Sequence, residues 1–150
     1  LQKIMRTTSH DARTVVNNTG STTALEAMYT RHHRYLFSRG ILQGFADLFW
    51  HHCISQPKAL RNRLKLVEKH LELEVFRIFK EKKNTETPIM ILSVGGGSAR
   101  ALIHSVHRLI KGEHGLKIKV INVDSDARAI EFGKKLAIKY NLQDIFKWIN

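Results

Sequence analysis

The sequence predicts an α/β fold in which helices pack on a parallel sheet, preceded by an α-helical N-terminal region. Residues 88–94 form a short apolar run with the branched side chains of a buried strand. Three glycines at 95–97 follow at once, and a helical pattern begins after them. A second apolar run over 118–123 ends on Asp124. A strand, a glycine turn, a helix and a second strand in this order are typical of a parallel βαβ unit.

The N-terminal region begins with a polar stretch. Residues 1–22 are rich in Thr, Ser and Asn and show no sustained period, so we expect a mobile or loosely packed lead-in. A helix is predicted over 24–39, with Thr22 or Thr23 as its cap and Gly40 as its stop.

Two further helices are predicted before the sheet. The first covers 41–54, and its bulky Phe49 and Trp50 are expected to pack against another layer. The second runs from Ser55 to about residue 83, with a proline in its first turn. Its expected inner face is Leu60, Leu64, Val67, Leu71, Val75 and Ile78. Its expected solvated face is Arg61, Arg63, Lys65, Glu68, Lys69, Glu72 and Arg77.

The loop at 84–88 divides the chain into an N-terminal helical region, 1–87, and a sheet region, 88–150. After the first strand, the pattern predicts a helix over 98–111, a strand over 117–123 and a helix from 125 or 126 to 140. Residues 145–149 are the expected start of a third strand. So short a sheet would expose a long edge and one apolar face. We therefore expect self-association into a homo-oligomer, or a longer natural polypeptide.

Composition limits the class of protein. The chain has 150 residues, 43% of them apolar, which suits one ordinary core. No apolar run approaches the roughly 18 residues of a membrane span, and the N-terminus lacks the pattern of a signal peptide. The single cysteine, Cys53, excludes an internal disulfide and fits a reducing compartment. These observations predict a soluble, cytoplasmic protein with no membrane partner.

The net charge of +12 raises the question of an acidic partner. Residues 1–87 carry 15 basic and 8 acidic groups, and residues 88–150 carry 10 and 5, so the excess is +7 and +5. A charge that is spread in this way usually marks solvated faces. A non-enzymatic basic module remains an alternative, and nucleic acid is a possible but not a favoured partner.

The glycine turn is suited to a nucleotide. A strand that turns sharply into a helix leaves backbone N–H groups free at the helix start, and glycines let a ligand reach them. An acid at the end of the next strand lies beside the same crevice, where it accepts hydrogen bonds from ribose hydroxyls. Asp124 has that position, although a cap on the following helix is the alternative role for its carboxylate.

The spacing Gly95, Gly97, Ala99 resembles the first motif of class I S-adenosylmethionine-dependent methyltransferases, which commonly reads acid-x-Gly-x-Gly-x-Gly after the first strand. The resemblance covers about 88–150, with Ser93 in place of the acid and Ala99 in place of the third glycine. It implies a Rossmann-like three-layer sandwich, truncated here, with S-adenosylmethionine as cofactor. It also implies that Asp124 binds the ribose and that Ser125 lies near the adenine. The candidate cofactor-binding residues are Ser93, Gly95, Gly96, Gly97, Asp124 and Ser125.

Residues 56–64 also look like the lead-in helix of some bacterial small-molecule and fatty-acid-ester methyltransferases. This similarity implies a small-molecule or fatty-acid-type methyl acceptor; the residues assign no catalytic group. The alternative enzyme is an NAD(P)-dependent oxidoreductase, whose fingerprint requires a small residue where Arg100 stands. For Arg100, contact with a carboxylate of the cofactor and a position on the protein surface are equally expected.

Other residue clusters favour plain structural roles. Adjacent side chains on a helix diverge, so neither His51-His52-Cys53 nor His32-His33 predicts a metal site. Cys53 is expected to be a small buried residue rather than a nucleophile. Arg61 and Arg63 are expected on a solvated or domain-docking face, with a ligand-facing role as the alternative.

Overall fold

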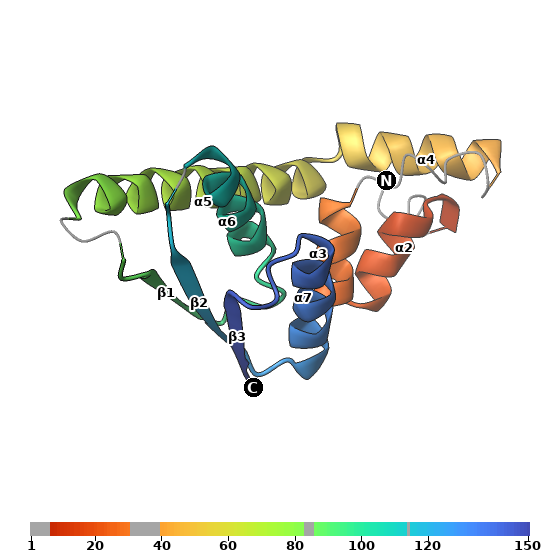
Figure 1. Cartoon of the computed structure of the whole chain (residues 1–150). Helices are drawn as coiled ribbons and strands as arrows, with labels where there is room; N and C mark the ends of the chain where they lie inside the picture. Colours follow the sequence, from red (N-terminus) through yellow and green to blue (C-terminus); the bar gives the residue numbers. More distant parts are fainter. Residues whose placement is uncertain (1–6, 31–39, 83–85, 114) are drawn as a thin grey trace. The chain divides into compact units, whose positions relative to one another are not determined.

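The computed structural model describes residues 7–30, 40–82, 86–113 and 115–150 (Figure 1). The chain divides into two compact units, residues 1–63 and 64–150, and the boundary in the sequence falls within the helix α5 (Ser55–Glu81). The boundary that the sequence predicts after residue 87 coincides with the start of the sheet. That this boundary separates two domains stays a prediction. None of the helices in the described part of the chain has the length and apolar character needed to cross a bilayer.

The first unit is built from helices. It contains α2 (His10–Asn17), α3 (Thr22–Tyr29), α4 (Ile41–Cys53) and the first turns of α5. Ser9 and Ser21 cap α2 and α3 by accepting hydrogen bonds from backbone N–H groups within each first turn. The buried core of this unit consists of Ala12, Val15, Ala24, Ala27, Met28 and Trp50.

Two predictions for the beginning of the chain are wrong. The polar lead-in contains the helix α2, because Ser9 supplies its cap and Ala12 and Val15, three residues apart, supply a narrow buried stripe. The helix predicted over 24–39 begins earlier, at Thr22, and α3 ends at Tyr29. Residues 31–39, with His32 and His33, lie outside the described part of the chain.

The helix α4 has the predicted bounds but buries an unexpected face. Trp50 is 5% exposed, as predicted, whereas Phe49 is 44% exposed, so the prediction that it packs inside is wrong. Asp47 and His51 take the inner side with Trp50, because hydrogen bonds between them and α2 with its cap residue hold them there. Apart from Trp50, the large apolar side chains of α4 therefore face solvent, namely Ile41, Leu42, Phe45 and Phe49.

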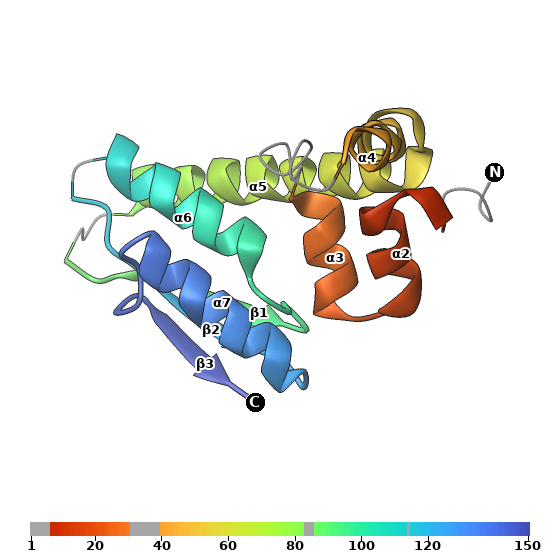
Figure 2. The ribbon, with the colours of Figure 1, turned by 90° about the vertical axis from the view of Figure 1, so that its right-hand side faces the viewer.

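The second unit is an α/β structure with a parallel sheet, as the sequence predicts. Its strands β1 (Ile89–Val94), β2 (Ile118–Val123) and β3 (Phe146–Ile149) are hydrogen-bonded in the order β1-β2-β3, all parallel. The crossovers are α6 (Arg100–Gly112) and α7 (Ala127–Lys139). Figure 2 shows these two helices side by side along the same face of the sheet.

The core of the second unit lies between the sheet, α6, α7 and the second half of α5. Ile103 and Val106 on α6 are completely buried, and Val75 of α5 is 2% exposed. Helix α7 approaches the sheet closely at Gly133, where a Cβ would lie 2.5 Å from the ring of Trp148. The glycine therefore makes room for the indole.

The other face of the sheet is open. Met90, Leu92 and Val94 are 58%, 66% and 77% exposed, while the alternate residues of β1 point toward the helices. The prediction of an uncovered apolar face is confirmed. The apolar run of β1 is thus buried on one face only, because α6 and α7 lie on the same side of the sheet (Figure 2).

Two charged residues of α5 are buried against the prediction of a solvated face. Glu68 is 9% exposed, with its carboxylate 2.9 Å from His104 Nδ1 and 2.7 Å from Arg108 of α6. Arg61 is 9% exposed within the first unit. Val67, predicted to face inward, is 47% exposed. The rest of the predicted apolar stripe packs inward: Val75 is buried, and Leu71 and Ile78 pack against the same core.

Replacing Ile103 with Ala is expected to destabilise the second unit by about 2–5 kcal/mol, because a fully buried side chain leaves a cavity. Denaturant unfolding of the whole chain measures the change. Ile138→Ala on α7, where the side chain is 59% exposed, is the control and should cost little. Equal costs for the two variants would contradict the core as described.

Burial in the α5–α6 interface lowers the pKa of His104 from about 6.5, although the hydrogen bond to Glu68 acts in the opposite direction. In the unfolded chain the imidazole takes up a proton near its ordinary pKa, while in the folded chain it stays neutral to lower pH. The free energy of unfolding should therefore fall as the pH drops below about 6.5. Denaturation of His104→Gln at pH 7.5 and 5.5 should show a smaller fall than the parent chain does.

Candidate functional site

The glycine turn and Asp124 lie at the same end of neighbouring strands. Residues 95–99 connect the carboxyl end of β1 to α6, and Asp124 directly follows β2. The register pairs Val94 with Val123, so the two segments leave the sheet side by side. In parallel α/β sheets the carboxyl ends of the strands are where ligands bind.

Gly97 is held by the carboxylate. Its backbone N–H donates to Asp124 Oδ2 over 2.6 Å. Its φ of +55° lies in the left-handed region, which an L side chain adopts only with strain. Ala99 adopts the same region, with φ +51°, directly before α6. The bend therefore depends both on a glycine and on a hydrogen bond to a charged acceptor.

Gly96 is required for a different reason. It lies over Ser93 Oγ and Asn122 Oδ1, and a Cβ at this position would come closer to both than real Cβ atoms come. Ser93 and Asn122 are register partners on β1 and β2 and point toward the helices. Ser93, a predicted cofactor residue, thus lies beneath the turn.

Asn122 is the residue at this site that the sequence analysis missed. Its side chain is completely buried, and its Nδ2 donates to the carbonyl oxygen of Gly97 over 3.1 Å. Within the described part of the chain, its Oδ1 accepts no hydrogen bond. The sequence feature that could have identified Asn122 is its position in β2, where a polar amide side chain occupies a core-facing position between apolar residues.

Asp124 does not cap α7. Asp126 does, since its side chain accepts from the N–H of Arg128 over 2.9 Å. Asp124 Oδ1 instead accepts from the N–H of Asp126 over 2.8 Å, which shapes the connection to α7. Each carboxylate oxygen thus accepts one backbone donor. Because a carboxylate has about four lone-pair sites, it retains capacity for further donors.

The turn presents bare backbone on its outer side. Apart from the adjacent residues of the chain, no atom of the described residues lies within 4 Å of where a Cβ on Gly95 or Gly97 would sit. Ala99 provides no side-chain cap, so the start of α6 keeps the positive end of its helix dipole available. Arg100 opens the helix, with its guanidinium carbon 5.8 Å from the ring centroid of Phe132.

The structure thus brings most of the predicted site residues together. The three glycines, Asp124 and Ser93 form one contiguous group around the bend. Ser125 is the next residue after Asp124 and is exposed.

The histidine and cysteine run of α4 does not converge. His51 is 3% exposed, whereas Cys53 is exposed and lines a surface hollow with His52. The prediction of a buried Cys53 is therefore wrong. No group of three or more potential metal ligands occurs among the described residues.

Neither a protein-family model, nor a curated protein sequence, nor a solved structure matches this chain.

Replacing Asp124 with Asn keeps the size of the side chain but removes its charge and turns one acceptor into a donor. We expect the free energy of unfolding to fall by about 1–3 kcal/mol, because a backbone N–H of Gly97 or Asp126 loses its acceptor. Urea denaturation measures this change. Asp144→Asn, at an exposed position, is the matched control, and equal effects of the two variants would contradict the role of the carboxylate.

Proposed function

We propose that the chain is an S-adenosylmethionine-dependent methyltransferase with a Rossmann-like arrangement of its sheet, acting on a small-molecule or fatty-acid-type acceptor. The observation that carries the proposal is the contact between Asp124 and the glycine turn. The carboxylate lies directly at the bend, 2.6 Å from the N–H of Gly97. The parallel strand order β1-β2-β3 is compatible with this arrangement.

Two properties of the bend support an adenosyl ligand. The open outer sides of Gly95 and Gly97 let a flat, polar ligand approach the backbone closely. The remaining lone pairs of Asp124 suit the pair of ribose hydroxyls, which are donors at a fixed spacing. In this proposal Gly95, Gly97 and Asp124 contact the cofactor and Ser125 lies near its adenine. Ser93 and Gly96 support the turn from beneath.

The cofactor supplies a methyl group activated by a sulfonium, so the reaction needs an acceptor placed in line with it. The task of the protein is then to bind and orient both reactants. The described residues around the bend supply binding and orientation of the cofactor; they assign no general base.

Arg100 counts against a nicotinamide dinucleotide. The dinucleotide fingerprint needs a small residue at this position for close packing of the helix on the strand. The guanidinium of Arg100 instead lies near Phe132 of α7. Oxidoreductase activity is therefore the weaker alternative.

Calorimetric titration of the whole chain with S-adenosylmethionine and its demethylated product tests the proposal. We expect saturable binding, with at least a tenfold loss of affinity in Asp124→Ala, because the ribose hydroxyls lose their acceptor. Gly97→Ala should also weaken binding, since it strains a φ of +55° and places a methyl group on the open side. Asp144→Ala and Gly112→Ala are the controls.

Circular dichroism must show that each variant remains folded. An absence of binding by the parent chain would contradict the proposal. Binding of NADH without binding of S-adenosylmethionine would favour the oxidoreductase instead.

A further inference from the structure

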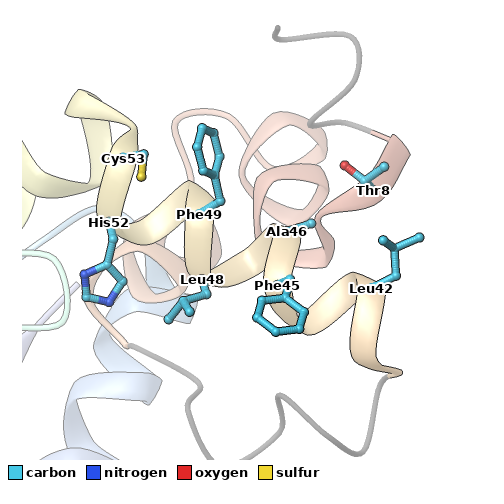
Figure 3. Close-up of a pocket in the computed structure, with 8 residues that line it drawn as sticks. All are labelled: Thr8, Leu42, Phe45, Ala46, Leu48, Phe49, His52 and Cys53. Atoms are coloured by element: carbon cyan, nitrogen blue, oxygen red, sulfur yellow. The ribbon is translucent and has the colours of Figure 1, made fainter.

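The outer face of α4 is apolar and exposed. Ile41, Leu42 and Phe45 are 67%, 79% and 66% exposed, and Phe49 is 44% exposed. Figure 3 shows Leu42, Phe45, Leu48 and Phe49 projecting from the helix. They line a surface hollow of about 720 Å³, with Thr8 and Cys53 also on its lining. Large exposed apolar patches on a soluble unit commonly mark an interaction surface.

The inner face of the same helix carries two polar side chains, Asp47 and His51, beside Trp50. Ser9 Oγ donates to Asp47 Oδ1 over 2.6 Å, and His51 Nε2 lies 2.8 Å from Asp11 Oδ2. Arg61 donates to His51 Nδ1 over 3.2 Å, so the ring proton lies on Nε2 and points to Asp11. These five side chains are each at most 9% exposed.

Burial of these acids gives the first unit a basic surface. Residues 1–63 contain 9 Lys and Arg but only 3 Asp and Glu, a net charge of +6. The three acids, Asp11, Glu26 and Asp47, are 2%, 8% and 7% exposed. Arg13, Lys58 and Arg63 are exposed. The ionic groups that the described part of this unit presents to solvent are thus basic.

We propose that the outer face of α4 binds the surface of a bilayer that contains anionic lipids. Such a surface offers acyl chains for Leu42 and Phe45 and negative headgroups for the basic side chains, and both attractions add in interfacial binding. Two copies of this unit, each with a net charge of +6, would repel each other, so charge disfavours self-association through the same face.

Binding at the surface is distinct from crossing the bilayer. A helix that lies in the interface needs one apolar face rather than a long apolar length. Helix α4 has 13 residues, too few to span, with its apolar side chains on its exposed side. The proposal thus departs from the expectation of no membrane partner. It concerns the first unit, and it holds or fails independently of cofactor binding by the second.

The single cysteine provides the probe. Cys53 is exposed and lines the hollow, so a polarity-sensitive fluorophore on its sulfur reports on lipid contact. The labelled whole chain is mixed with vesicles of phosphatidylcholine alone, or with about a third of phosphatidylglycerol, and co-sedimentation of the unlabelled chain is measured in parallel. We expect a blue shift and sedimentation with the anionic vesicles, both weakened by salt. Neutral vesicles should bind at least tenfold less.

The decisive variant is Leu42→Ser with Phe45→Ser, both at positions more than 60% exposed, so that folding is preserved. It should lose at least tenfold in binding to anionic vesicles. Met90→Ser with Leu92→Ser, similarly exposed on the open sheet face, is the matched control and should bind as the parent does.

Failure of the parent chain to bind anionic vesicles would overturn the proposal. So would equal binding by the two double variants. A dimer in light scattering that Leu42→Ser with Phe45→Ser dissociates would assign the face to a second copy instead.

Discussion

The second unit depends on the hydrogen bond from the Gly97 N–H to Asp124. It joins the turn after β1 to the end of β2, 27 residues further along the chain. Because the acceptor is ionised, the bond is stronger than one between neutral groups. It holds Gly97 in a left-handed conformation that directs the chain into α6. The opposite carboxylate oxygen directs the chain into α7 through the N–H of Asp126. One side chain thus orients the beginnings of both crossover helices.

The three consecutive glycines satisfy separate requirements. Gly96 is packed from beneath by Ser93 and Asn122, whereas Gly95 and Gly97 have positive φ and face open space. The packing beneath Gly96 and the positive φ values are needed by any sharp strand-to-helix turn. The open outer side of Gly95 and Gly97 is in addition what a ligand needs in order to reach the backbone. Asn122 supports the turn, since its Nδ2 donates to the carbonyl oxygen of Gly97. Its own Oδ1 has no hydrogen-bond partner among the described residues.

The sequence predicted the α/β unit well because its signals are local. Apolar strands, glycine turns and the cap at Asp126 act within a few residues, and the structure has β1, β2, β3 and α7 close to the predicted bounds. The prediction failed where contacts between residues far apart in the sequence determine which side chains are buried. Asp11 meets His51 across 40 positions, and Glu68 meets Arg108 across 40. Charged residues buried by such partners look solvated in a periodic pattern. The burial of His51 on α4 and of Arg61 and Glu68 on α5 was therefore not expected, although most of the apolar stripe of α5 does pack inward. Of the residues that the structure brings together at the bend, the sequence pattern singled out Asp124 and the glycines but not Asn122.

The contact between Gly133 and Trp148 makes two positions interdependent. The indole occupies the space where any side chain at 133 would begin, and a Cβ there would also lie 2.7 Å from the carbonyl oxygen of Ser98. A larger residue at 133 is thus compatible with the fold only together with a smaller ring at 148 and a displaced backbone at 98. Divergent versions of this chain should accordingly retain the glycine–tryptophan combination or exchange both members at once, which gives an evolutionary signature of how closely α7 approaches β3.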